Sequence, residues 1–107
     1  NEELTFDRLF INTGAEANLP KIDALVEGGR IFTSKTLLAQ KQQIKKLAIL
    51  GGGPIGLEFA SMYTHFGSEV TVIEAGQKLL PRFEPEIVNA AKADMEEDGV
   101  RLCYLHR

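Results

Sequence analysis

From residue 46 onward, short apolar runs alternate with stretches in which apolar residues recur at helical spacing. The runs LAIL (47–50), EVTVIE (69–74) and VRLCYL (100–105) are typical of strands buried in a parallel sheet, with LAIL buried on both faces. Between them lie PIGLEFASMYTHF and PEIVNAAKADMEED, which have the period of amphipathic helices. The order strand, helix, strand, helix, strand predicts an α/β fold, a parallel sheet with right-handed crossovers.

The two predicted helices have recognisable ends. Pro54 and Pro85 suit the first turn of a helix, and Gly67 and Gly99 suit the position just beyond its end. The spacing predicts two inward faces, formed by Ile55, Phe59, Met62, Tyr63 and Phe66 in the first helix and by Ile87, Val88, Ala91 and Met95 in the second.

The first 45 residues are less regular. RLFINTG (8–14) reads as a short strand that runs into a turn. Residues 15–45 carry proline and Gly-Gly breaks, so we expect a connector with one short helix near residues 37–43.

Gly51, Gly53 and Gly56 match the pattern G-x-G-x-x-G between the first predicted strand and helix. In a dinucleotide-binding fold the first glycine permits a tight turn, the second lets a pyrophosphate approach the backbone, and the third lets helix and strand pack closely. The helix N-terminus adds free N–H groups and partial positive charge. The same glycines also suit a methyltransferase, or packing alone.

Glu74 closes the second predicted strand, 23 residues after Gly51. An acid at this place binds the ribose hydroxyls of a dinucleotide and repels a 2′-phosphate, which favours NAD(H) over NADP(H). The alternative is an ordinary carboxylate at a strand end. Beyond it lie Lys78 and Arg82, which are either solvated residues or phosphate contacts. Glu58 lies within the first predicted helix, and periodicity alone places it on the helix surface.

Composition narrows the classes of function. The 107 residues have a net charge of -3 and no long basic run, which argues against nucleic acid as a partner. The single cysteine, Cys103, excludes an internal disulfide, and no stretch is long and apolar enough to span a membrane. Without a signal-peptide layout, we expect a cytoplasmic protein. The chain begins at Asn1 and stops within a predicted strand, so we expect a fragment of a longer protein.

The stretch GGGPIGLEFASMYTHFGSEVTVIEAGQKLLPRFEPEI resembles the NAD-binding domain of the flavin-dependent pyridine nucleotide–disulfide oxidoreductases. This family includes lipoamide dehydrogenase, glutathione reductase and mercuric reductase. The upstream LFINTGAEANLP resembles the family's second flavin-contact stretch. The resemblance implies a flavin-domain strand and Thr-Gly-Ala turn in residues 1–17, a connector in 18–45, and a truncated Rossmann-type NAD-binding domain in 46–107.

The resemblance also implies roles for individual residues. It places Glu58 near the nicotinamide and the flavin, against the surface position that periodicity suggests. The remaining implied contacts are the NAD pyrophosphate at Gly51, Gly52, Gly53, Pro54, Ile55 and Gly56, the adenosine ribose at Glu74 and Ala75, and FAD at Thr13, Gly14 and Ala15.

By this resemblance the intact parent, a homodimer active in cell redox homeostasis, would pass a hydride from NADH to FAD and electrons on to a disulfide or related acceptor. The family's redox-active cysteine pair and catalytic histidine are absent here, so the chain would hold no catalytic residue and no metal site and would be inactive without the rest of the flavoprotein. Cys103 reads as a packed thiol of the third strand. Two family features are also missing, an aromatic gate between Gly51 and Glu58 and a proline before the first NAD strand. The alternative function is a non-catalytic NAD-sensing regulatory domain.

In the family a later strand lies beside the first strand of the NAD domain, and this chain lacks it. We therefore hypothesise that residues 10–12 pair with residues 48–50, from the same or a neighbouring chain, or that the chain self-associates through this open edge.

Overall fold

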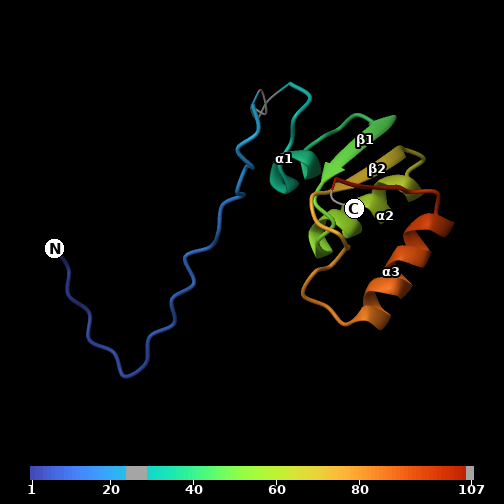
Figure 1. The fold of residues 1–107 in the computed structure, drawn as a ribbon. Coiled ribbons are helices and arrows are strands. Elements are labelled where there is room, and N and C mark those ends of the chain that lie inside the picture. Colours follow the sequence, from blue (N-terminus) through green and yellow to red (C-terminus); the bar gives the residue numbers. More distant parts are fainter. Residues whose placement is uncertain (24–28, 106–107) are drawn as a thin grey trace. The chain divides into compact units, whose positions relative to one another are not determined.

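The computed structural model describes residues 1–23 and 29–105. The chain forms two units, Asn1–Ala39 and Gln40–Arg107, which we describe separately. The second unit contains the strands β1 (Lys46–Leu50), β2 (Glu69–Glu74) and β3 (Arg101–Tyr104), with helix α2 (Pro54–His65) after β1 and helix α3 (Pro85–Glu97) after β2 (Figure 1). This is the order of elements that the sequence predicts.

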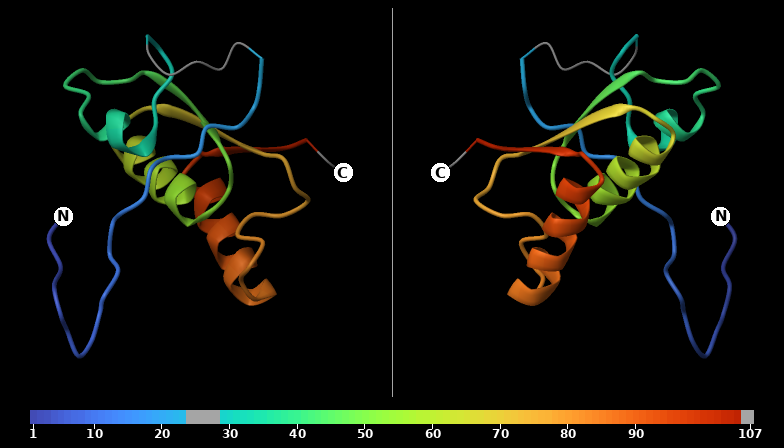
Figure 2. Two further views of the ribbon diagram at one scale, coloured as in Figure 1. Left: turned by 90° about the vertical axis from the view of Figure 1, so that its left-hand side faces the viewer. Right: turned by 90° about the vertical axis from the view of Figure 1, so that its right-hand side faces the viewer.

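The three strands form a parallel sheet in the order β1-β2-β3. Both crossovers step in the same direction across the sheet, so right-handed connections bring both helices to one face. Figure 2 shows α2 and α3 together on that face. The carboxyl ends of β1 and β2 meet at one edge, where Leu50 pairs with Ile73.

The predicted helix ends are confirmed. Gly67 has a φ of 87° and follows the C-cap of α2. The N–H groups of Gly67 and Ser68 donate to the carbonyl oxygens of Thr64 and Tyr63 in the last turn of α2. The end of α3 has the same arrangement at Gly99, with a φ of 86°.

The buried stripe of α2 differs from the predicted one. Leu57, Ala60 and Tyr63 are buried, whereas Ile55 and Phe66 are each 60% exposed. The apolar arc of this helix is wider than its contact with the sheet, so only part of the arc is buried. In α3, Val88 and Met95 are buried as predicted, but Ile87 is 51% exposed.

No helix of the described residues in this unit covers the opposite face of the sheet. Ala48 and Leu50 of β1 are exposed on it, and Ile73 and Cys103 are half-buried. The prediction that β1 is buried on both faces is therefore wrong, because α2 and α3 both cover the same face. For the same reason Cys103 lies in the third strand, as predicted, but it is not a fully packed thiol.

In the first unit, helix α1 spans Ser34–Leu38 rather than the predicted residues 37–43. It begins early because Thr33 and Thr36 form a capping box: the Thr36 N–H donates to the Thr33 hydroxyl, and the Thr33 N–H donates to the Thr36 hydroxyl. Threonine in place of the usual glutamate or glutamine makes this signal hard to read from sequence.

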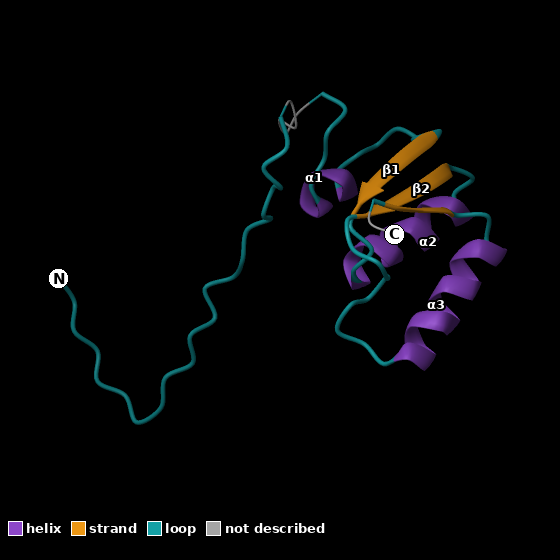
Figure 3. Cartoon of the chain, in the orientation of Figure 1, coloured by secondary structure: helices purple, strands orange, loops and turns teal. Residues whose placement is uncertain are grey.

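The strand predicted over residues 8–14 is not formed, and Figure 3 draws this segment as loop. Phe10 is 88% exposed and Ile11 is 79% exposed. An apolar segment becomes a strand only where another strand takes up its backbone hydrogen bonds, and no strand does so among residues 1–23 and 29–39 of this unit. The hypothesised pairing of residues 10–12 with residues 48–50, from the same or a neighbouring chain, involves both units and stays a prediction.

Candidate dinucleotide-binding site

The glycine-rich turn joins β1 to α2 at the carboxyl edge of the sheet. Its first residue, Gly51, has a φ of 107°, a conformation that side chains with a Cβ rarely adopt. The Gly51 N–H donates to the carbonyl oxygen of Ile73 at 2.8 Å, which continues the β1–β2 ladder by one residue. The chain therefore turns sharply at the point where the strand ends.

Gly56 lies in the first turn of α2 and holds the helix close to this turn. A Cβ on Gly56 would collide with the carbonyl oxygen of Gly51 and would lie 3.4 Å from Cγ2 of Ile49. Any side chain here would push the helix away from the strand. This is the packing role predicted for the third glycine of the motif.

Gly53 has different surroundings. Its backbone is ordinary, with φ of -79° and ψ of 177°, and a Cβ on it would meet no atom within 4 Å. It is the N-cap of α2, no side chain caps this end, and the first turn carries no acid. Pro54 and Ile55 beside it are exposed. An open space in front of a helix N-terminus suits the charge and the size of a phosphate.

Glu74 binds the same turn from the end of β2. Its Oε2 accepts from the Gly52 N–H at 2.7 Å, and its Oε1 accepts from the Gly76 N–H at 2.6 Å. A carboxylate has about four acceptor positions, so these two bonds leave others free for a ligand. Glu74 is half-buried, and Ala75 next to it is exposed. The sequence analysis placed Glu74 at this edge but missed its bond to the glycine turn.

Tyr104 is a further residue of this edge that the sequence analysis did not single out. It ends β3 and pairs with Glu74 in the register of β2 and β3. Burial raises the pKa of its hydroxyl, and the negative charges of Glu96 and Glu74 add to the effect. Tyr104 could have been found from the sequence, because it ends the third predicted strand. The carboxyl ends of neighbouring parallel strands share one edge, where ligands of such sheets bind.

The predicted site residues thus fall into separate groups. The glycines 51–53 and 56 meet Glu74 at one edge of the sheet, whereas Glu58 is exposed on α2. Thr13, Gly14 and Ala15 belong to the first unit and are exposed, and Gly14 has a φ of 83°. Their predicted contact with FAD stays a prediction.

Within the described residues, no three His, Cys, Asp or Glu side chains come together as a metal site would need. Nor does the described part of the chain contain a helix with the length and apolar character to cross a membrane.

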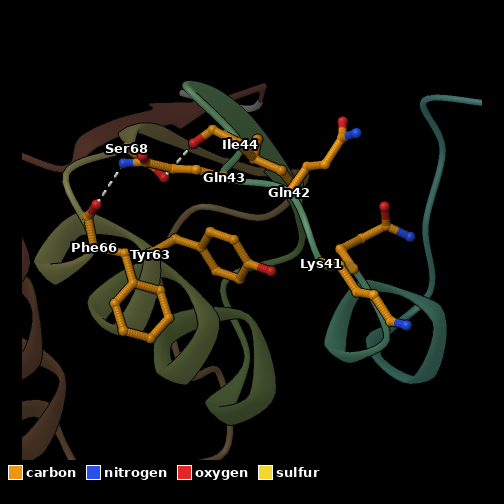
Figure 4. Close-up of a pocket in the computed structure, with 8 residues that line it drawn as sticks. Lys41, Gln42, Gln43, Ile44, Tyr63, Phe66 and Ser68 are labelled. Atoms are coloured by element: carbon orange, nitrogen blue, oxygen red, sulfur yellow. Dashed lines mark hydrogen bonds between the residues drawn. The ribbon is translucent and has the colours of Figure 1, made fainter.

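A cavity of about 320 Å³ lies at the other end of α2 (Figure 4). The Gln43 side-chain amide donates to the Phe66 carbonyl oxygen at 2.8 Å, and the Ser68 hydroxyl donates to the Ile44 carbonyl oxygen. These bonds attach the segment before β1 to the end of α2. Because α2 has 12 residues, about 18 Å separate this cavity from the glycine turn, and it is not part of the same site. The cavity is lined by residues 40–44, Tyr63, Phe66 and Ser68.

The family model described as "Pyridine nucleotide-disulphide oxidoreductase" matches residues 1–106. The chain belongs to this family. The match includes both units and therefore extends beyond the glycine turn and its helix.

Individual proteins named as oxidoreductases or reductases are similar to most of this chain. The probable pyridine nucleotide-disulfide oxidoreductase RclA of Escherichia coli is 40% identical over 100 residues, which are 94% of this chain and 23% of RclA. The mercuric reductase of Lysinibacillus sphaericus is 37% identical and is matched over 94% of this chain and 18% of its own length. A solved structure, the HOCl-induced flavoprotein disulfide reductase RclA from Escherichia coli, has a TM-score of 0.81 at 38% identity and matches 90% of this chain and 22% of that one. The chain thus spans about a fifth of the length of these proteins.

Proposed function

We propose that this chain is the NAD(H)-binding module of an FAD-dependent oxidoreductase. The observation that carries the proposal is the open space at Gly53, in front of an uncapped helix N-terminus and beside the carboxylate of Glu74. The pyrophosphate would lie against Gly51–Gly53 and the first turn of α2, and the adenosine ribose would lie at Glu74 and Ala75. Pro54, Ile55 and Gly56 would complete the phosphate end.

The proposed nucleotide is NAD(H) rather than NADP(H). Both oxygens of Glu74 retain acceptor capacity after bonding to Gly52 and Gly76, so the carboxylate can accept hydrogen bonds from two ribose hydroxyls. A 2′-phosphate at the same place would put two negative groups in contact. Lys78 and Arg82 are exposed and lie four and eight residues beyond Glu74; in this proposal they remain solvated.

The proposal for the intact protein rests on the family. NADH supplies a hydride, which FAD accepts and delivers as electrons to a disulfide or a related acceptor. Glu58 would lie near the nicotinamide and the flavin, and Thr13, Gly14 and Ala15 near the FAD. The parent would be a homodimer in the cytoplasm that contributes to cell redox homeostasis. The 107 residues alone would bind nucleotide without turnover.

The family match favours this proposal over a non-catalytic NAD-sensing domain. The match begins at residue 1, ahead of the connector, whereas an NAD-sensing domain needs only the glycine turn and the strand-end acid. Relatives named as a reductase and an oxidoreductase are likewise similar to this chain over 94% of its length.

Calorimetry with NADH and NADPH on the 107-residue chain tests the proposal. We expect NADPH to bind at least about tenfold more weakly than NADH, and Glu74→Arg to reverse the preference. The control is Glu69→Arg, the same change of charge at the opposite end of β2, where only an exposed ion pair with Lys46 at 3.3 Å is lost. Equal binding of the two nucleotides by the natural chain would remove the role given to Glu74, and no binding of either would remove the proposal.

A further inference from the structure

Gly52, the middle residue of the glycine run, is buried, and both of its backbone polar groups are bonded to the segment from Glu74, the last residue of β2, to Leu80. Its N–H donates to Glu74 at 2.7 Å, and its carbonyl oxygen accepts from the N–H of Leu80 at 2.9 Å. This peptide is therefore held from two directions by residues more than twenty positions away in the sequence. Its neighbours Gly51 and Gly53 are the residues that form the turn.

Two leucines of that segment contact Gly52, Leu79 through its side chain and Leu80 through its backbone N–H. Leu79 is 1% exposed, and its Cδ2 occupies the place where a Cβ on Gly52 would lie. Leu80 is 7% exposed and has a φ of 45°, which a non-glycine residue adopts only where its surroundings hold it there. The Phe83 N–H donates to the Leu80 carbonyl oxygen at 2.9 Å and closes this short turn.

We propose that Leu79 and Leu80 are positioning residues for the nucleotide, an inference that rests on the proposed function. The Leu79 side chain supports the Gly52 peptide by packing, and the Leu80 N–H fixes the orientation of its carbonyl group. Together with Glu74 they hold the glycine turn in its binding geometry before any nucleotide arrives. A turn that is already ordered loses less conformational freedom on binding, and the affinity is higher for that reason.

The arrangement also connects the two ends of the site. The residue proposed to bind the ribose and the residues that hold the pyrophosphate turn belong to one continuous segment, from Glu74 to Leu80. A change in the packing of Leu79 therefore acts on phosphate binding without touching the nucleotide.

The test uses Leu79→Ala with Met95→Ala as its matched control. Met95 is 7% exposed and lies near the end of α3, at the opposite edge of the sheet from the glycine turn, so its truncation leaves a comparable cavity away from the site. We expect Leu79→Ala to weaken NADH binding by about tenfold, and Met95→Ala to change it by less than about twofold at a similar loss of melting temperature. Leu79→Met nearly conserves the volume of the side chain, and we expect it to bind NADH with the affinity of the natural chain.

Hydrogen exchange of the Gly52 amide gives a second readout that needs no nucleotide. We expect this amide to exchange roughly tenfold faster in Leu79→Ala than in the natural chain, and to be unchanged in Met95→Ala. If the alanine variant does not fold, Leu79→Val should show a smaller shift in the same direction.

The inference is overturned if Leu79→Ala leaves Gly52 exchange unchanged, or if the control variant lowers NADH affinity equally. Failure of the natural chain to bind NADH would instead refute the proposed function, and Gly52 exchange would still decide whether Leu79 positions the turn.

Discussion

Gly53 offers a direct test of the phosphate site, because it is the one glycine of the G-x-G-x-x-G motif with an ordinary backbone and open space at its Cβ. Gly51 has a positive φ, and Gly56 contacts the backbone of the turn, so substitutions there disturb the fold. Gly53→Val adds a branched side chain to the space proposed for phosphate oxygens. We expect it to weaken NADH binding by at least about fivefold while the chain remains folded.

The free-energy changes expected for Gly53→Val are small for folding and larger for nucleotide binding. Replacing glycine in a compatible conformation stabilises by about 0.4–1 kcal/mol through the unfolded chain. Losing the glycine N-cap of α2 costs a few tenths to about 1 kcal/mol, so the two effects nearly cancel. The melting temperature should move by less than roughly 8 °C. In the bound state, forcing a side chain into occupied space costs about 1–3 kcal/mol or more, a loss of roughly five- to 150-fold in affinity.

The assay pairs thermal melting with calorimetric titration of NADH, and Gly99→Val is the control. Gly99 also has open space at its Cβ, but its φ of 86° makes any side chain strained by about 1–3 kcal/mol. It lies beyond α3, at the amino end of β3, away from the glycine turn. We expect the two variants to show opposite behaviour, with weakened binding in Gly53→Val and lost stability in Gly99→Val. A folded Gly53→Val chain that binds NADH within about twofold of the natural one would refute the phosphate site.

Three further predictions concern stability and association. Thr64→Val should raise the free energy of unfolding by about 1 kcal/mol in denaturant titration, because the buried Thr64 hydroxyl has no hydrogen-bond partner among the described residues; a decrease would contradict this. Tyr104→Phe should lose less stability than the natural chain as the pH rises above 10. The pKa of Tyr104 is raised in the folded chain, so this residue contributes stability below its ordinary pKa of 10.0, and the contribution is lost as the pH rises through the pKa of the folded state. Equal alkaline melting curves would exclude this contribution. The chain should self-associate with rising concentration in sedimentation experiments, since β1 is an edge strand whose Leu50 is 48% exposed, and Leu50→Lys should suppress the association; a natural chain that stays monomeric would refute it.

The sequence predicted the elements from residue 46 onward because their signals are local. Pro54 and Gly67 mark the two ends of α2, and the period of each segment depends on the segment alone. The glycine turn was predictable for the same reason, since Gly51 supplies the positive φ at the end of β1 and Gly56 allows the close approach to the Gly51 carbonyl group. These parts of the fold needed no knowledge of distant contacts.

The errors concern features that depend on distant partners. The segment 8–14 has the composition of a strand but no partner strand in its unit, and β1 has the composition of a buried strand although only one face is covered. The exposure of Ile55 and the burial of Ala60 follow from how closely α2 approaches the sheet, which periodicity does not reveal. The clamping of Gly52 by Glu74 and Leu80 joins segments 22 or more residues apart and was invisible for the same reason.

The double use of Glu74 has a consequence for the choice of nucleotide. The carboxylate bonds to the N–H groups of Gly52 and Gly76, so it shapes the turn as well as offering its remaining lone pairs to a ribose. A hydrogen bond to a charged group contributes about 1.5–3 kcal/mol, and an arginine at position 74 can accept neither of these two. Exchange of Glu74 for a cation would therefore attract a 2′-phosphate while loosening the turn that holds the pyrophosphate. Preference for NADP(H) gained in this way should come with weaker binding of both nucleotides, unless Leu79 and Leu80 hold Gly52 without the carboxylate.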